Sequence, residues 1–339
     1  MIGFIISGIK IISLLGFLIL IHESGHFIVA KLCKVKVNEF AIGFGPTIWK
    51  KQGKETKYAI RLIPLGGFVN MEGEEEASEA EGSFSKVSIP RRIAIVVAGA
   101  TVNILFGFIV YFILMASTGV TISNEISAVL DGYNSADSGL EVNDKVIEID
   151  GIKVKSRNDV TKILSQNKGE VLKLKIDRNG EIIEIYIEPT LKEINGVNAY
   201  FLGVTFKPVE NNFTNHIYYG FNETIEFSSS IVENLKNLIF GGVKADQMMG
   251  IVGISDVVVS TNGFKEFIYI LSLVSVSLGV TNLLPIPALD GGKLVILIME
   301  AIRKKPLKQE TEASITLVGF SILIALSIYV TYNDILRIF

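Results

Sequence analysis

The sequence predicts a multi-pass α-helical membrane protein with four transmembrane helices and one small soluble α+β domain. The 339-residue chain is 49% hydrophobic, and its mean hydropathy is +0.46. Four apolar segments approach or exceed the ~20 residues that a helix needs to cross a bilayer. A polar region with alternating strand patterns, residues 121–207, follows the second of these segments.

The four predicted membrane-spanning helices are residues 1–30, 93–118, 266–292 and 313–332. The first could be mistaken for a signal peptide. Lys10 interrupts its apolar run, however, and no small-residue cleavage site follows, so we expect a retained span. The fourth is the clearest, because it contains no charged residue.

Basic residues predict how these spans are oriented. Residues 31–92 contain eleven Lys and Arg, and residues 293–308 contain five. Because short connections rich in Lys and Arg remain in the cytoplasm, we expect both to be cytoplasmic. Both termini and residues 121–207 are then extracytoplasmic. The net charge of −3 indicates no nucleic-acid partner, so the lipid bilayer is the environment that we expect.

The residues His22-Glu23-Ser24-Gly25-His26 form an HExxH pattern inside the first apolar segment. On a helix, two histidines four positions apart share a face and can bind one metal ion. Glu23 lies beside them, where it can take a proton from water at the metal. Ionisable groups in such an apolar run are costly in lipid, so they indicate a functional site.

The depth of this site follows from Lys31, which marks the expected cytoplasmic end of the first span. With a rise of ~1.5 Å per residue, His26 lies about 7 Å and His22 about 13 Å inside that boundary. The metal would therefore lie within the membrane, nearer the cytoplasmic side. Water must then reach it through a cavity lined by protein.

A catalytic zinc usually has three protein ligands, and Asp290 is the best candidate for the third. The remaining histidine, His216, falls in the region expected outside. Asp290 follows Pro285 and Pro287, which cannot continue a helix, so the backbone must unwind at membrane depth. Such backbone is tolerated where it lines a cavity. Taken alone, Asp290 would more simply be an ordinary residue at a helix end, but its combination with the HExxH pattern favours a metal ligand.

Two amides in apolar runs have open roles. Asn282 could bind a substrate carbonyl or stabilise a developing oxyanion, or it could form a structural hydrogen bond to unwound backbone. Asn103 in the second span poses the same question, and there a structural role is favoured. Cys33, the only cysteine, excludes an intramolecular disulfide and is expected to pack as a small apolar residue.

The region after the second span predicts a small β-rich module at 121–207. Residues 156–167 read as an amphipathic helix, and two alternating strands flank Asn179-Gly180, a hairpin signal. In the extracytoplasmic or membrane-surface segment 208–265, residues 225–240 have helical spacing. Residues 250–254 read as a tight loop before the third span.

Together these residues resemble the site-2 protease family of intramembrane zinc metalloproteases, in its bacterial PDZ-containing branch (regulator of sigma-E protease-like). The HExxH pattern and the NxxPxPxLDGG pattern at 282–292 carry the resemblance. Residues 43–46 look like the family's GxGP element, and 98–103 resemble its AGPxxN element, with Ala100 in place of proline.

The resemblance implies a fold with a cytoplasmic-side, membrane-associated β-hairpin or sheet region at 31–92 and an extracytoplasmic PDZ domain at 121–207. It also implies that Zn²⁺ is the cofactor and that Glu23 is the catalytic acid/base. The implied metal ligands are His22, His26 and Asp290. We expect substrate contacts from Asn282, Gly43, Gly45, Pro285 and Pro287.

The function that this resemblance implies is hydrolysis of single-span proteins in the bacterial cell membrane, such as anti-sigma factors or remnant signal peptides. A prior site-1 cut would prepare these substrates. One alternative is a PDZ scaffold with a vestigial metal site, which the intact Glu23 argues against. Another is a metal transporter, which the scarcity of charge in the other three spans argues against.

Overall fold

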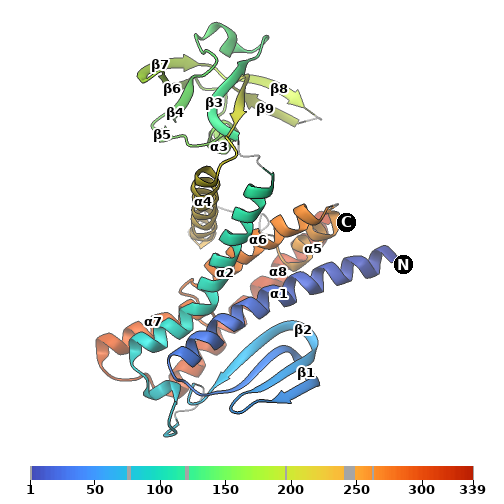
Figure 1. Ribbon diagram of the computed structural model, residues 1–339, viewed down its shortest axis with the longest axis vertical. Helices are drawn as coiled ribbons and strands as arrows, with labels where there is room; N and C mark the ends of the chain where they lie inside the picture. Colours follow the sequence, from blue (N-terminus) through green and yellow to red (C-terminus); the bar gives the residue numbers. More distant parts are fainter. Residues whose placement is uncertain are drawn as a thin grey trace. The chain divides into compact units, whose positions relative to one another are not determined.

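The computed structural model describes residues 2–74, 78–118, 122–194, 197–239, 249–261 and 263–338 (Figure 1). The chain forms two compact units. The first combines Met1–Leu114 with Gly220–Phe339, and the second is Met115–Tyr219.

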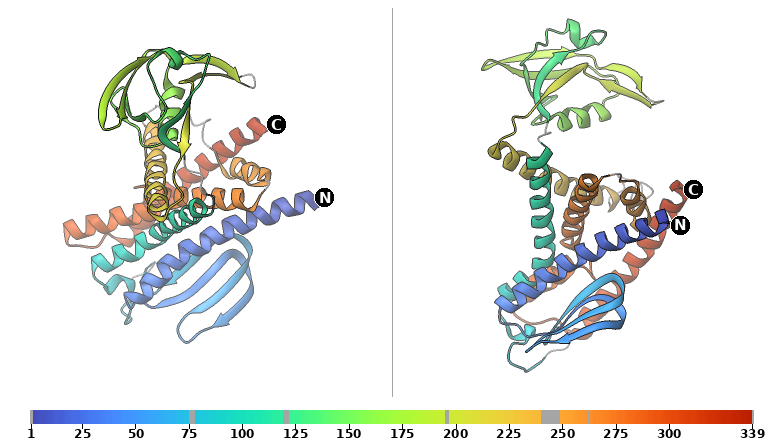
Figure 2. Two further views of the ribbon diagram at one scale, coloured as in Figure 1. Left: turned by 45° about the horizontal axis from the view of Figure 1, so that its top comes forward. Right: turned by 45° about the vertical axis from the view of Figure 1, so that its right-hand side comes forward.

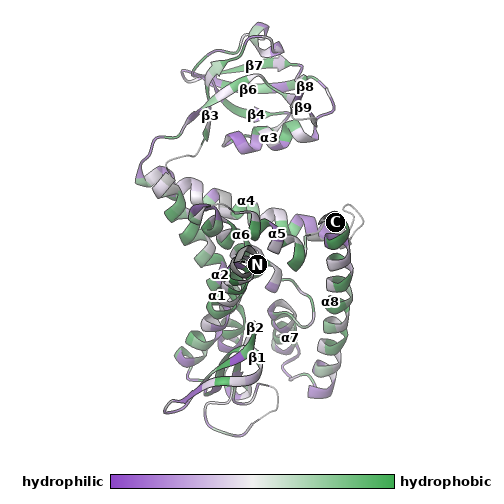
Figure 3. Cartoon of the chain, turned by 90° about the vertical axis from the view of Figure 1, so that its right-hand side faces the viewer, coloured by the Kyte–Doolittle hydropathy of each residue, from purple (hydrophilic) through white to green (hydrophobic). Residues whose placement is uncertain are grey.

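Four long helices of the described chain are apolar enough to cross a membrane, as predicted. They are α1 (Ile2–Leu32), α2 (Ile89–Thr118), α6 (Phe264–Asn282) and α8 (Gln309–Ile338). Figure 3 shows that hydrophobic residues dominate α2 and α8. The protein is therefore a membrane protein by the length and composition of its helices.

A β-sheet packs beside the C-terminal half of α1 (Figures 1 and 2). Its strands β1 (Val37–Gln52) and β2 (Lys57–Met71) are antiparallel, and both bend. Phe40 therefore pairs with both Tyr58 and Val69, so the start of β1 lies between the two halves of β2. Phe27 of α1 meets the rings of Phe40 and Tyr58 edge-on at 5.2 Å and 6.1 Å, which fixes the sheet against the helix.

The third predicted span ends earlier than residue 292. Helix α6 stops at Asn282, residues 283–289 form turns, and a separate helix α7 (Asp290–Arg303) begins at Asp290. The two prolines of this segment explain the break. Helix α7 is anchored near its far end, where Glu300 is buried and accepts a 2.9 Å hydrogen bond from Arg92 of α2. A short 3₁₀ turn, η1 (Phe84–Lys86), precedes α2.

Residues 250–254 were expected to form a tight loop, and this prediction is wrong. Helix α5 (Ile251–Ser260) begins there, after helix α4 (Phe213–Ile239). Asp334 of α8 accepts hydrogen bonds from the backbone N–H groups of Gly250 and Gly253, at 2.9 Å and 2.8 Å. At the other end of α5, Lys10 of α1 donates to the carbonyl of Thr261 at 2.8 Å. Opposite charges therefore hold both ends of this short helix, in the sense that its dipole favours.

The second unit contains a five-strand path in the order β10-β3-β4-β6-β7, with β5 paired to β4. Helix α3 (Arg157–Gln166) lies where the sequence predicted an amphipathic helix, and Ser156 is its N-cap. Asn179 and Gly180 turn between β6 and β7 with φ of 54° and 91°, which confirms the predicted hairpin. The strands and the remaining 3₁₀ turn of the unit are β3 (Ile122–Val129), η2 (Asn134–Asp137), β4 (Lys145–Ile149), β5 (Ile152–Lys153), β6 (Leu172–Arg178), β7 (Glu181–Ile187), β8 (Thr190–Ile194), β9 (Val197–Phe201) and β10 (Val204–Pro208).

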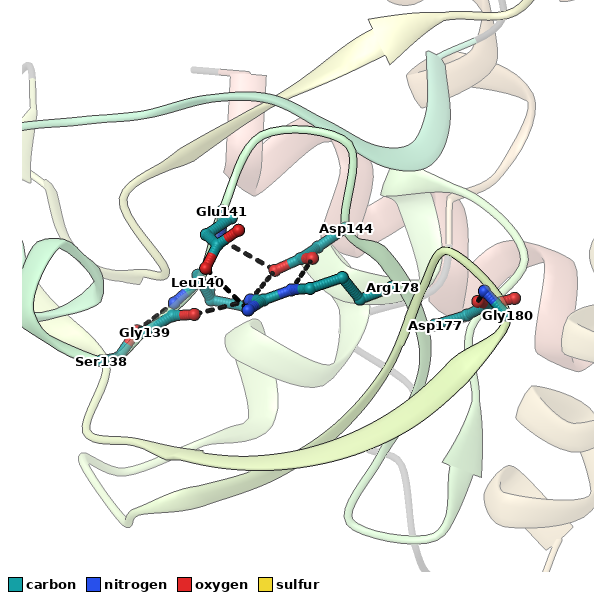
Figure 4. A network of polar contacts seen from close by, with 8 residues as sticks. All are labelled: Ser138, Gly139, Leu140, Glu141, Asp144, Asp177, Arg178 and Gly180. Carbon is teal, nitrogen blue, oxygen red and sulfur yellow. Dashed lines mark hydrogen bonds and ion pairs between the residues drawn. The ribbon is translucent and has the colours of Figure 1, made fainter.

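A buried aspartate and a partly exposed arginine form an ion pair in this unit (Figure 4). Asp144, which is 1% exposed, accepts two hydrogen bonds from the Arg178 guanidinium, at 2.7 Å and 2.8 Å. The same guanidinium also binds Glu141 and the carbonyl of Gly139. Asp144 thus joins the turn after η2 to the end of β6 with a bidentate, charge-assisted pair.

Candidate metal centre

The structure brings His22, His26 and Asp290 together, although Asp290 is far from the histidines in sequence. The two Nε2 atoms of the histidines lie 3.2 Å apart. Asp290 Oδ2 lies 3.3 Å from His22 Nε2 and 3.4 Å from His26 Nε2. The three atoms therefore form a nearly equilateral triangle.

This triangle fits a zinc ion. Zinc binds histidine nitrogen and carboxylate oxygen tetrahedrally at ~2.0–2.1 Å, which places ligand atoms ~3.3–3.4 Å from one another. Asp290 Oδ2 is also buried and accepts no hydrogen bond within the described chain. A buried carboxylate oxygen without a donor is costly unless a cation or another partner satisfies it. The donor set and the orphaned oxygen thus both suit Zn²⁺.

The segment before α7 delivers Asp290 to this point. Ala288 has a positive φ of 76°, and Leu289 is the N-cap of α7. The next residues are Gly291 and Gly292, where a Cβ atom would lie 2.1 Å from the Leu284 carbonyl oxygen and 2.4 Å from that of Ile286. Only glycine allows the first turn of α7 to pack so closely on the unwound segment.

Helix α2 approaches α1 closely behind the histidines. A Cβ atom on Gly25 would lie 2.6 Å from the carbonyl oxygen of Ala98. A Cβ atom on Gly99 would lie 2.3 Å from His26 Nε2 and 2.9 Å from His22 Cε1. The glycines let the two helix backbones meet, and α2 thereby becomes the wall on which both rings rest.

Helix α2 also provides a polar contact for each ring. His26 Nδ1 lies 2.8 Å from the backbone oxygen of Ile95, to which it can donate its proton. His22 Nδ1 lies 3.3 Å from the side-chain amide of Asn103. Ring nitrogens opposite a metal usually make such contacts, which leave Nε2 free for the metal.

Glu23 lies with these ligands in a cavity of about 320 Å³. The segment 67–71 of β2 forms one wall, and a Cβ atom on Gly67 would lie 2.9 Å from Glu23 Cγ. Residues 287–290 form a second wall. A 2.7 Å ion pair between Lys293 of α7 and Glu312 of α8 also lines the cavity. These side chains therefore face a space that is lined by protein.

The other predicted site residues are only partly brought together. Pro287 lines the cavity, whereas the described cavity wall does not include Pro285, Gly43 or Gly45. Gly43 and Gly45 have positive φ values of 87° and 82° and bend β1. Asn282 is the last residue of α6 and likewise does not line the cavity. His216 lies in the second unit, where it contacts Asn211.

Sequence reasoning missed several site features. The contact of Asn103 with His22 joins residues 81 apart, and the strand 67–71 became a cavity wall only through the bend of β2. The close approach of α1 and α2 could have been predicted, because Gly99 lies in a run of small residues, 98–101, shortly before Asn103. The ion pair of Lys293 with Glu312 had no such signal.

A zinc-ligand triangle with an adjacent glutamate, set in a membrane helix, defines the class of membrane metallopeptidases. The comparison with protein families agrees: the model of Peptidase family M50 matches residues 10–326. The chain belongs to this family, which is the site-2 protease family of zinc metalloproteases. It is therefore a zinc-dependent protease, and the scaffold and transporter alternatives have no support.

Similar proteins cover nearly the same length. The chain is 34% identical to CPE1693 of Clostridium perfringens, over 96% of this chain and 98% of that protein. It is 33% identical to FN1322 of Fusobacterium nucleatum, over 97% and 98%. Both of these relatives are named as zinc metalloproteases. It is 29% identical to "Regulator of sigma-W protease RasP" of Bacillus subtilis, over 99% and 100%.

Proposed function

We propose that this protease hydrolyses peptide bonds within or near the transmembrane segments of single-span membrane proteins. One observation carries the proposal: the zinc-ligand triangle and Glu23 are built on α1, a helix apolar enough to span a membrane. A substrate span can meet such a site without leaving the bilayer. The name of the Bacillus subtilis relative supports anti-sigma factors as one substrate class, and remnant signal peptides fit the same chemistry.

The roles of the site residues follow from their positions. His22, His26 and Asp290 hold the zinc ion. When bound, zinc supplies Lewis acidity and makes water acidic enough to lose a proton near neutral pH. Glu23 accepts the proton of the attacking water and returns it to the nitrogen of the leaving amide. Asn282 stays a candidate for oxyanion stabilisation only if substrate binding brings it to the cavity.

Substrate presentation is proposed to use the edge of β2. Segment 67–71 pairs with β1 on one side, and no other described strand pairs with it on the other. An unwound substrate segment can add to this edge as a further strand. Its carbonyl groups are then held beside Glu23 through backbone hydrogen bonds, which do not depend on side chains.

The placement in the cell is part of the same proposal. The abundance of Lys and Arg in 31–92 supports a cytoplasmic β1–β2 sheet, a metal site near the cytoplasmic face of the cell membrane, and extracytoplasmic termini. The second unit is then extracytoplasmic. We assign it as a PDZ domain that excludes large ectodomains, so that substrates arrive already cut by a site-1 protease.

The experiment that tests the proposal maps the cut. Purified protein in liposomes is given a single-span substrate with a labelled apolar segment, and mass spectrometry identifies the products. We expect a cut within or next to the apolar segment that a zinc chelator abolishes and added zinc restores. Products cut only in a distant soluble region would refute intramembrane cleavage while leaving zinc-dependent proteolysis intact.

A further inference from the structure

The side-chain amide of Asn103 lies beside His22, a candidate metal ligand, and only one of its two polar atoms has a hydrogen-bond partner in the described chain. Its side chain is fully buried, because the residue is 0% exposed. Its Nδ2 atom lies 3.3 Å from Nδ1 of His22, whereas its Oδ1 atom is buried without a hydrogen-bond partner in the described chain. An orphaned oxygen beside a candidate metal ligand needs an explanation.

The position of the proton on the His22 ring determines which end of the Asn103 amide can form a hydrogen bond with it. A neutral imidazole carries a proton on one nitrogen and a lone pair on the other. His22 Nε2 points into the ligand triangle, so in the zinc-bound protein it must offer its lone pair. The proton of His22 then resides on Nδ1, which faces Asn103.

An N–H group at Nδ1 needs an acceptor, and Nδ2 of an amide is a donor. The two ends of a side-chain amide are nearly equal in size. A half-turn of the Asn103 amide therefore places Oδ1 against Nδ1 without moving the backbone. The same turn gives Oδ1 a donor and moves Nδ2 to the position that Oδ1 leaves.

We infer that Asn103 is a positioning residue for the metal centre: its Oδ1 accepts the Nδ1 proton of His22 and fixes the ring that binds zinc. The inference deepens the proposed function and rests on it. Asn103 would then serve His22 as the Ile95 carbonyl serves His26, where the 2.8 Å contact already has a donor and an acceptor. Both ligand rings are thus oriented by α2, and Asn103 needs no contact with the substrate.

The backbone around Asn103 is well placed to hold this amide. Its own carbonyl oxygen accepts a 2.8 Å hydrogen bond from Ser275 of α6, and Ser275 is completely buried. One turn further along α6, a Cβ atom on Gly279 would lie 2.7 Å from the Ala100 carbonyl oxygen, so the two helices are in direct backbone contact. Ser275 therefore offers a control that alters the packing at Asn103 but leaves its amide in place.

The test measures zinc affinity by chelator competition in the purified full-length protein, without any peptidase assay. The Asn103→Leu variant keeps the approximate shape but removes the acceptor, and we expect its zinc dissociation constant to rise about 10- to 100-fold. Asn103→Asp keeps an acceptor and should stay within about threefold of wild type. Ser275→Ala, the matched control, should do the same.

Three results would overturn the inference: wild-type affinity in Asn103→Leu, an equal loss in Ser275→Ala, or no rescue by Asn103→Asp. If wild type itself bound no zinc, the metal centre would be wrong, and this inference with it. Wild-type binding combined with unchanged Asn103→Leu would reject the role of Asn103 alone. The two failures are therefore distinguishable.

A second readout needs no variant of Asn103. The chain has three histidines, so ¹⁵N-histidine NMR spectra of the zinc-loaded protein are simple, and His216→Gln assigns the ring outside the site. We expect the rings of His22 and His26 to carry their protons on Nδ1. A His22 ring with its proton on Nε2 would contradict the inference even if Asn103→Leu failed to fold.

Discussion

At the scale of single residues, the metal centre depends on glycines, which have no side chain and so let neighbouring segments approach closely. Gly25 and Gly99 leave the space in which α1 and α2 meet, and Gly67 lets β2 approach Glu23. Each position has protein atoms within about 3 Å of where a Cβ atom would lie. The histidines can therefore rest on the α2 backbone itself, which restricts their motion more than a flexible side chain could.

Gly99→Ala should consequently weaken zinc binding. The new methyl group would lie 2.3 Å from His26 Nε2, so either the ring or the helix must move. Overpacking of this kind costs about 1–3 kcal/mol, which, if it falls on the zinc-bound state, raises the zinc dissociation constant roughly 5- to 150-fold. Chelator competition measures it. Gly8→Ala, where nothing lies within 4 Å of the added atom, is the matched control and should bind zinc normally.

Unchanged zinc affinity in Gly99→Ala would show that the rings do not rest on α2 as described. Unfolding of the variant is distinguished from a local effect by circular dichroism in detergent, which should report the wild-type helix content.

How well a site residue could be predicted depended on whether a pattern in the nearby sequence fixed its position. His22, Glu23 and His26 could be placed together because helical geometry alone brings positions four apart onto one face. Asp290 could be proposed because two prolines forced the backbone to unwind just before it. The role of Asn103 could not be derived, since its contact with His22 depends on how α1 and α2 cross.

At the scale of elements, the bends of β1 and β2 decide what faces the metal. Each strand pairs along both halves, so residues 67–71 and 47–52 become the two edges of the sheet. Only the edge at 67–71 lines the cavity that contains Glu23. The sequence predicted a sheet in this region but not which edge would face the site, because the bend at Gly43 and Gly45 determines it.

The edge at 67–71 is testable with proline. Neighbouring residues in an antiparallel strand point their N–H groups to opposite sides, so either Phe68→Pro or Val69→Pro removes a donor from the open edge. Of the two, we expect the variant that loses the outward-facing N–H group to keep its fold. It should cleave a single-span substrate about tenfold more slowly, which is the effect of losing one or two hydrogen bonds. Lys50→Pro, on the opposite edge, should cleave at the wild-type rate.

Substrate cleavage by quantitative gel assay decides between the outcomes. Wild-type rates in both Phe68→Pro and Val69→Pro, with normal melting curves, would exclude strand addition at this edge.

Helix α5 shows where element prediction failed. Only residues 250–254 were expected to form a tight loop, and the helix that begins there, with ten residues, is too short to span a membrane. The structure instead holds both helix ends through Asp334 and Lys10, which come from opposite ends of the chain. No pattern within residues 250–260 could reveal partners that only the tertiary fold supplies.

At the scale of the whole molecule, the chain consists of two compact units that differ in composition. The first contains the apolar helices, the β1–β2 sheet and the metal-ligand triangle. The second is a separate α+β unit with its own core, in which Ile126, Val146 and Leu174 are fully buried. Composition and apolar length predicted this division, because a bilayer and water select different residues.

The molecule combines a helix that is long and apolar enough to span a membrane with a candidate hydrolytic site on the same helix. Water, zinc and a peptide must meet in a cavity of about 320 Å³ that the apolar helices help to enclose. The cavity contains the carboxylate of Glu23, to which we assign the proton transfer, and three candidate ligand atoms at the spacing that suits zinc.

The most direct measurement compares wild type with Glu23→Gln, at matched zinc content, for cleavage of a purified single-span substrate. Because proton transfer by a positioned side chain contributes about 10²- to 10⁴-fold, we expect Glu23→Gln to lose at least a hundredfold in rate while retaining zinc. Cleavage of the apolar segment by Glu23→Gln at the wild-type rate would contradict the account.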